Sequence, residues 1–401
     1  MKESYKEPFL CMALLMVMIF EVPYFNLFLI AGFLMLISYI VIYRRHSLAN
    51  AELLILLLFI VLYFAIDTNL ETSNEYKFWY SVSTVSLYAC GYSMNYATLN
   101  IEERSRKIEY IIRRIAMAYT AFVLITVVYS AIKGQFGISR NPLNFWTGTL
   151  RAATHYGTMS VFPLAYGLYL AIVAEGKKEH RTGWLLVVFA TLVAIVTASR
   201  TVLLLVPVGA IVAYFTNIGI RGKVTMKNIC QLIGVIVLLG LSIVVFKTGL
   251  FGIQTAFFKT QLGQRYLLGH ASTLTDDERW RKMEFFIHNI DKSVWGGGYA
   301  RVNVGNLHNV YLNVFDLSGI IPFALLLVFT GQVMRDYRRM RRNGSVTIPV
   351  AVLLFLVLLL SFIQMLIEPT MESVPAFMWC LLMICGMQCK VSRCKEYIMG
   401  R

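Results

Sequence analysis

Two adjacent polar residues lie in the stretch NLHNVYLNVFDLSG, at 306–319, where an apolar run begins. His308 carries the side chain best suited to exchanging a proton near neutral pH, so it is a candidate general base. Asn309 is either the N-cap of a helix or a ligand for a substrate oxygen. Asp316 follows eight residues after His308, about 80° further round a helix. There it is expected to orient His308, to pair with an arginine, or to be protonated and structural.

A second candidate lies in TASRTVLLLVPVG, at 197–209, where one apolar segment ends and another begins. Arg200 would sit at the start of the new helix, with Ser199 and Thr201 as capping residues. The N-terminus of a helix attracts anions, and the guanidinium fork suits phosphate oxygens. The alternative is an arginine that reaches the lipid headgroups. The glycines at 296–298 allow either close backbone approach to a ligand or a tight turn.

The elements that must position these residues are apolar helices. The chain of 401 residues is 58% hydrophobic, with 15% charged residues and a mean hydropathy of +0.64, whereas soluble domains carry roughly a quarter charged residues. Apolar runs long enough to cross a bilayer recur throughout. We therefore expect an all-α polytopic membrane protein, a single membrane domain over 1–401, with about twelve transmembrane helices. The expected spans are 8–22, 25–43, 51–67, 78–98, 111–132, 155–174, 183–198, 201–219, 229–248, 309–333, 348–367 and 374–389.

The net charge of +15 is distributed as in a membrane protein rather than a nucleic-acid-binding one. Basic residues concentrate in alternate connections, and the run RDYRRMRR at 335–342 follows the tenth span. Because positive charge is retained on the cytoplasmic side, both termini are expected to be cytoplasmic. The seven cysteines then lie in spans or on the cytoplasmic side, so no external disulfide is expected. Cys385 and Cys389, one helical turn apart, are interpreted as packing residues rather than metal ligands.

One external connection, 249–308, is much longer than the rest. Within it, RWRKMEFFIHNI at 279–290 has the periodicity of an amphipathic helix, with Met283, Phe286, Ile287 and Ile290 on one face. Positive charge on the translocated side opposes the topological preference, so we expect the loop to bind an anion. Its candidate arginines are Arg265, Arg279, Arg281 and Arg301. A smaller external loop, 133–154, carries Arg140, Arg151 and Trp146.

TASRT at a helix start, a basic external helix, a GGGY turn and LHNVYLNVFDLSGIIPF together resemble the O-antigen ligase and polymerase superfamily. In that family a His-Asn pair is followed by nine residues and a glycine, as His308-Asn309 is by Gly319. The helix-start arginine matches Arg200, and an arginine on the loop helix matches Arg279 or Arg281. The resemblance covers roughly 150–335. Pro322 stands where ligases often have a second glycine, a departure that favours a polymerase.

Members of this family transfer a glycan from a polyprenyl diphosphate carrier to an acceptor hydroxyl on the outer face of the bacterial cytoplasmic membrane. The resemblance implies a metal-independent, inverting transfer that needs no cofactor, with His308 as general base. The diphosphate would be held by Arg200 and Arg279 or Arg281, with Arg265 and Arg301 as weaker candidates. Asn309 would position a sugar or phosphate oxygen. Trp280, Trp295 and Tyr299 would stack on sugars, although an aromatic belt at the membrane surface explains them equally well.

The implied partners are a polyprenyl-diphosphate-linked oligosaccharide donor, a glycan or lipid-linked acceptor, membrane lipids, a flippase and a chain-length regulator, with no nucleic acid. Polymerase and O-antigen ligase remain alternatives, because the two share a donor and differ only in the acceptor. A ligase would join the polymer to lipid A-core. A more remote alternative is a transporter or flippase of lipid-linked oligosaccharides. Transporters tend to show related halves, and this sequence shows no internal repeat.

Overall fold

The computed structural model describes residues 9–43, 50–66, 73–221 and 278–394, and this part of the chain is helical without a β-strand. The expected span at 229–248, most of the loop at 249–308, and Arg265 lie outside the described residues. The longer helices are α1 (Phe9–Ile19), α2 (Leu27–Tyr43), α3 (Ala51–Ile66), α4 (Asn74–Ser93), α5 (Ile101–Ile132), α7 (Val161–Ile172), α8 (Lys177–Val196), α9 (Arg200–Arg221), α13 (Glu278–His288), α16 (Ile320–Arg342), α17 (Ile348–Ile367) and α19 (Pro375–Ser392). The shorter ones are α6 (Ala153–Met159), α14 (Tyr299–Val304), α15 (Val310–Ser318) and α18 (Thr370–Ser373).

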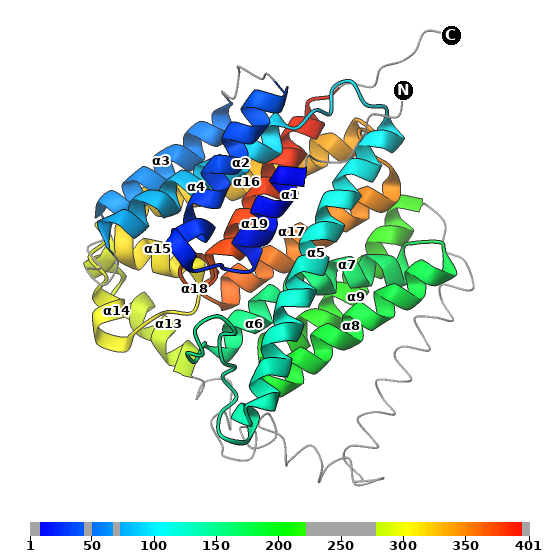
Figure 1. The fold of residues 1–401 in the computed structure, drawn as a ribbon. Helices are drawn as coiled ribbons and strands as arrows, with labels where there is room; N and C mark the ends of the chain where they lie inside the picture. The colour runs from blue at the N-terminus through cyan, green and yellow to red at the C-terminus, as the bar shows by residue number, and fades with distance from the viewer. Residues whose placement is uncertain (1–8, 44–49, 67–72, 222–277, 395–401) are drawn as a thin grey trace, which may run out of the picture.

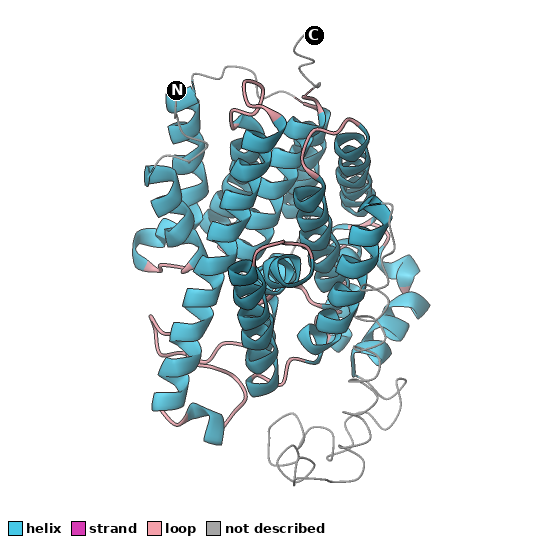
Figure 2. Cartoon of the chain, turned by 90° about the vertical axis from the view of Figure 1, so that its right-hand side faces the viewer, coloured by secondary structure: helices cyan, strands magenta, loops and turns pink. Residues whose placement is uncertain are grey.

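The long helices pack side by side into one bundle with connections at its two ends (Figures 1 and 2). Among the described residues, six helices are long and apolar enough to cross a membrane: α5, α8, α9, α16, α17 and α19. Large apolar side chains such as Val61, Leu185 and Phe215 are exposed on the outside of the bundle, as expected where lipid is the solvent. The prediction of an all-α, membrane-embedded protein is confirmed, while the count of twelve spans stays a prediction.

Helix α19 forms the core of the bundle and packs closely against α4 (Figure 1). A Cβ atom added at Gly91 would lie 1.9 Å from the carbonyl oxygen of Met383, and one added at Gly386 would lie 2.1 Å from that of Tyr88. Small residues at such positions let two backbones touch, which is how helices gain packing energy where lipid supplies no hydrophobic drive.

One end of the bundle is basic. The Arg393 guanidinium bonds the Glu52 carboxylate at 2.6 Å, Arg104 donates to the Ser345 carbonyl at 2.9 Å, and Asn343 donates to the Ser392 carbonyl at 3.3 Å. These contacts bring the start of α3, the start of α5 and the ends of α16 and α19 together. The RDYRRMRR run belongs to this end, because it forms the last turns of α16. The short helices α6, α13, α14 and α18 gather at the opposite end (Figure 1).

The tenth span is broken where a continuous helix over 309–333 was expected. Gly319 adopts φ 84° and ψ −173° and separates α15 from α16. The turn that contains the three glycines packs against this break: Gly297 N–H donates to the Leu317 carbonyl at 3.0 Å and Gly298 N–H to the Asp316 carbonyl at 2.8 Å. The turn therefore satisfies carbonyls at the end of α15 that hydropathy alone assigned to an uninterrupted helix.

Candidate active site

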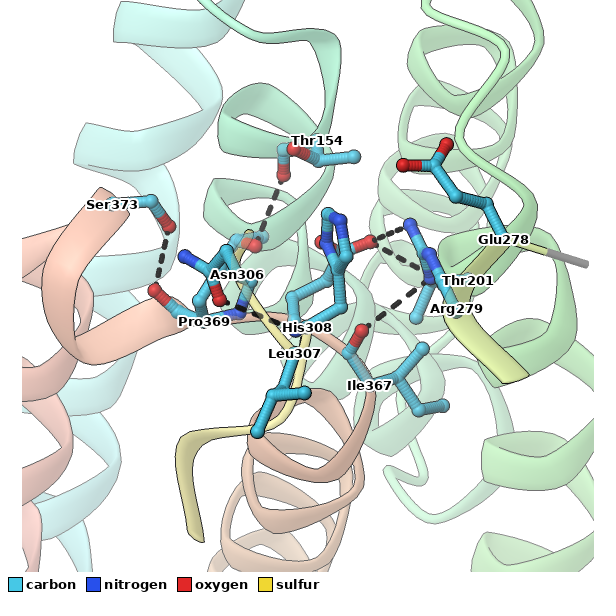
Figure 3. A network of polar contacts seen from close by, with 12 residues as sticks. Thr154, Thr201, Glu278, Arg279, Asn306, Leu307, His308, Ile367, Pro369 and Ser373 are labelled. Atoms are coloured by element: carbon cyan, nitrogen blue, oxygen red, sulfur yellow. Dashed lines mark hydrogen bonds and ion pairs between the residues drawn. The ribbon is translucent and has the colours of Figure 1, made fainter. Parts of the chain in front are cut away.

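A buried carboxylate lies at the centre of the polar cluster at the end of the bundle away from RDYRRMRR. Glu368 directly follows α17, and only 2% of its side chain is exposed. Its Oε1 accepts a hydrogen bond from Arg279 of α13 at 2.7 Å and one from Thr201 of α9 at 3.3 Å. Arg279 also donates to the Ile367 carbonyl at 3.4 Å (Figure 3). One carboxylate therefore joins three elements that are far apart in the sequence.

His308 approaches the same carboxylate from the other side. Its Nδ1 lies 3.7 Å from Glu368 Oε2, and 30% of its side chain is exposed. Both atoms are buried, and neither has a hydrogen-bond partner among the described residues. The backbone of His308 has φ 54°, a left-handed conformation that costs a non-glycine residue about 1–3 kcal/mol and is concentrated at functional sites. The imidazole thus has Nδ1 buried beside Glu368, while part of the side chain stays exposed.

The segment that precedes α15 is fixed by asparagine side chains. Asn313 Oδ1 accepts from Leu307 N–H at 3.0 Å, and Asn313 Nδ2 donates to Asn306 Oδ1 at 2.6 Å. Asn306 Oδ1 also accepts from His308 N–H at 3.2 Å. Asn309 is the N-cap of α15, with its side chain accepting from the N–H of Leu312 at 3.1 Å. Of its two expected roles, the structure gives Asn309 the capping one.

Two more arginines contribute charge near Glu368. Burial and the neighbouring Arg279 lower the pKa of Arg140; Glu368 opposes this effect, and Arg200 adds to it. Arg140 comes from the loop before α6, and Arg200 is the exposed first residue of α9. Thr201, expected as a cap, instead donates to Glu368. Arg140 thus interacts electrostatically with two other guanidiniums and with the carboxylate of Glu368.

Helix α13 turns Arg279, rather than Arg281, toward Glu368. Arg281 and Trp280 are exposed. Glu278 forms an ion pair with Lys282 at 2.8 Å, and its pKa is lowered by the hydrogen bond and charge of Lys282 and, more weakly, by His308 and Arg281. Phe286 is the buried anchor of the helix, whereas Ile287 and Ile290, expected on the same apolar face, are exposed.

The remaining predicted site residues serve other contacts. Arg301 forms an ion pair with Glu372 of α18. Tyr299 stacks on Phe285 with ring centroids 6.0 Å apart, and its hydroxyl accepts a hydrogen bond from Lys292 at 3.0 Å. The structure does not bring Arg301 or Tyr299 into the hydrogen-bond network of Glu368.

Asp316 has a structural role. Its carboxylate accepts from Ser293 Oγ at 2.6 Å and from the backbone N–H groups of Ala300 and Arg301, both at 2.9 Å. It therefore ties the segment around α14 to α15, and neither His308 nor an arginine side chain is among its hydrogen-bond partners. The backbone N–H groups of Gly297 and Gly298 also bond carbonyls of α15. Of the two interpretations of the glycines at 296–298, these contacts favour a tight turn over close approach to a ligand.

One group of described residues has the composition of a metal site, and it lies at the basic end of the bundle. Ligand atoms of Glu52, Asp336 and Cys389 lie within 4.8 Å of one another. However, Glu52 is paired with Arg335 at 3.3 Å and with Arg393 at 2.6 Å. Two guanidiniums already supply positive charge there, so the geometry favours an ion-pair network that joins α3, α16 and α19.

Sequence reasoning missed two members of the cluster around His308. Glu368 gave a detectable signal, since an ionisable residue at the edge of an apolar span is a functional candidate. Arg140 gave a weaker one, as a basic residue in an external loop. Comparison with known protein families finds no matching family, and comparison with characterised proteins finds no similar sequence.

Proposed function

We propose that this protein is a membrane glycosyltransferase that polymerises glycan repeat units carried on a polyprenyl diphosphate. The observation that carries the proposal is the convergence of His308, Arg279 and Arg200 near the buried Glu368. A proton acceptor beside a surplus of guanidinium groups suits a reaction in which a hydroxyl is deprotonated while a phosphate leaves.

The charge of the cluster supports a diphosphate substrate. Arg279 pairs with Glu368, and Arg140 interacts electrostatically with Arg279, Glu368 and Arg200. Three positive charges less one negative charge leave a surplus of two. A sugar diphosphate ester carries two negative charges, so the bound donor would neutralise the cluster. Arginine suits this task because its planar fork binds phosphate oxygens in pairs and stays charged when half-buried.

The proposed reaction is a single displacement. The acceptor hydroxyl transfers its proton to Nε2 of His308 as its oxygen forms a bond to the anomeric carbon. The bond between that carbon and the phosphate oxygen breaks, and its electron pair leaves with the polyprenyl diphosphate. The leaving group gains one negative charge while the imidazole gains one positive charge. The arginines stabilise the charge that develops on the diphosphate, an effect typically worth about 10²–10³ in rate for one donor.

The position of the cluster supports a reaction on the outer face of the membrane. The run RDYRRMRR lies at the opposite end of the bundle, and the positive-inside rule assigns that end to the cytoplasm. The donor headgroup would then be used after its transfer across the bacterial inner membrane.

A ligase that joins finished polymer to lipid A-core is the second candidate, because the same cluster would serve it. Pro322 favours the polymerase. Transport of lipid-linked oligosaccharide is less well supported, since transporters place their site near the midplane, whereas Glu368 follows the last residue of α17.

The test uses a deletion strain complemented with His308→Ala, Arg200→Ala or wild type. Loss of polymer, with single repeats still attached to the final anchor, is the result expected of a polymerase. Polymer accumulating on the carrier lipid would instead assign ligase activity. His288→Ala is the matched control, because His288 is exposed on α13 and its Nδ1 lies 2.8 Å from the Glu284 carbonyl of its own helix. Unchanged polymer length and amount in both site variants would refute the proposal.

A further inference from the structure

We propose that Glu368 is a positioning residue whose carboxylate is released from Arg279 and closes on His308 when the donor diphosphate binds. The inference rests on the proposed function and adds to it a coupling between donor binding and the general base.

The two carboxylate oxygens of Glu368 are in unequal positions. Oε1 accepts from both Arg279 and Thr201, while Oε2 lies 3.7 Å from His308 Nδ1. That distance exceeds an N–H···O hydrogen bond by about half an ångström. Neither of the two facing atoms has another hydrogen-bond partner among the described residues. A small side-chain rotation would therefore satisfy both buried atoms at once.

The backbone of Glu368 favours such a rotation over a shift of the chain. Its N–H donates to the Gln364 carbonyl at 2.8 Å, and its carbonyl accepts from Thr370 N–H at 2.8 Å. Pro369 follows and restricts Glu368 to the extended conformation that it has, φ −134° and ψ 148°. Movement is thus confined to the side chain.

A diphosphate would compete directly for Arg279. The guanidinium is held by Glu368 on one side, and 28% of the Arg279 side chain is exposed. Phosphate oxygens bound to Arg279, Arg200 and Arg140 would replace Oε1 as the acceptor for Arg279. The freed carboxylate would retain its charge in a buried place, and His308 Nδ1, which lies 3.7 Å from Oε2, is a nearby group able to pair with it.

The new hydrogen bond would prepare His308 for catalysis. A carboxylate that accepts from Nδ1–H fixes the tautomer in which Nε2 is the proton acceptor, and it stabilises the imidazolium that forms. Among the described residues, His308 faces Glu368 at the end of α17 and interacts electrostatically with Glu278 of α13, while Arg279 contacts the same Glu368. Since Glu278 and Lys282 pair with each other, Glu368 is the group whose pairing the donor would change.

The experiment measures the reactivity of His308 toward diethyl pyrocarbonate as a function of pH, by mass spectrometry of purified full-length protein. Each protein is measured with and without undecaprenyl diphosphate, whose affinity is determined in parallel. The variants are Glu368→Gln and, as matched control, Glu372→Gln, which removes the carboxylate paired with Arg301. Arg279→Ala provides a second test should Glu368→Gln fail to fold, with Arg281→Ala as its charge-matched control.

Undecaprenyl diphosphate should raise the midpoint of the wild-type reactivity curve, and the rise should be smaller by about one pH unit in Glu368→Gln. Glu368→Gln should bind the probe at least as tightly as wild type, because the competing carboxylate is gone. Glu372→Gln and Arg281→Ala should resemble wild type, and Arg279→Ala should raise the midpoint without the probe. Equal rises in wild type and Glu368→Gln, or weaker binding by Glu368→Gln, would overturn the inference alone. Binding that is absent, or unaffected by Arg279→Ala, would overturn the proposed function as well.

Discussion

Gly319 offers the sharpest test of how the His308 segment is held, because its backbone conformation is available to glycine almost alone. With φ 84° and ψ −173°, an alanine would be strained by about 1–3 kcal/mol. Its Cβ atom would also lie 2.7 Å from the Val294 carbonyl oxygen. That carbonyl accepts from Ile320 N–H at 2.9 Å, and loss of this bond would cost about 1 kcal/mol more.

Gly319→Ala should therefore destabilise the fold by about 2–4 kcal/mol, a change of about 30- to 1000-fold in the ratio of folded to unfolded protein. Thermal unfolding in detergent can be followed with a thiol-reactive dye, since Cys11, Cys90, Cys380 and Cys385 are buried in the folded protein. Gly331→Ala is the matched control. A Cβ atom there meets no described atom within 4 Å, and in a helix alanine is more favourable than glycine by roughly 0.5–1 kcal/mol. Equal midpoints for the two variants would refute the account of the break between α15 and α16.

Three further predictions follow from the cluster. Arg279→Ala should lower the rate of glycan transfer in membranes by about 10²-fold or more, whereas Arg281→Ala should retain most of it; equal losses would contradict the assignment of Arg279. Asn313→Leu should leave the helical content unchanged by circular dichroism but abolish most transfer, because the segment before His308 loses its two hydrogen bonds with the Asn313 side chain; a fully active variant would exclude that role. Lys282 lowers the pKa of Glu278 from its ordinary 4.5, so this pair stabilises the fold above that pH and the contribution is lost as the pH falls through the lowered pKa. Lys282→Met should remove this pH dependence in acid-unfolding curves, and identical wild-type and variant curves would argue against the pair.

The helical, membrane-embedded nature of the fold could be predicted because a bilayer permits few alternatives. Apolar runs of about twenty residues with little charge have to form helices, since every backbone polar group must be satisfied within the segment. The break at Gly319 could not be found in this way, because 309–333 as a whole is apolar enough and long enough to be assigned to one span. It depends on hydrogen bonds with the glycine turn, 20 or so residues earlier in the chain, and hydropathy carries no information on such pairing.

The cluster around His308 was predictable only in part. Arg200 was singled out because it begins a helix, whose N-terminus attracts anions, and Arg279 because positive charge on the external side of the membrane is unusual. Glu368 was not predicted, because an anion site is expected to contain positive charge, and nothing in the sequence shows that Arg279 and Thr201 share this carboxylate. Arg140 lies in a loop whose path depends on tertiary contacts. Asp316 was correctly singled out as an expensive buried charge, but its partners are backbone N–H groups, which no sequence pattern reveals.

The length of helix α15 fixes the distance between the segment before His308 and the segment that follows α13. Asn309 defines its start and Gly319 its end, and between them Asn313 holds the segment before His308 while Asp316 holds the segment that continues from α13. Insertion or deletion of one residue between these two polar side chains would turn one relative to the other by about 100° and displace it by about 1.5 Å along the axis. His308 and Arg279 would then no longer meet at Glu368. The site therefore requires the nine-residue length of α15, from Val310 to Ser318, whichever apolar side chains the helix carries.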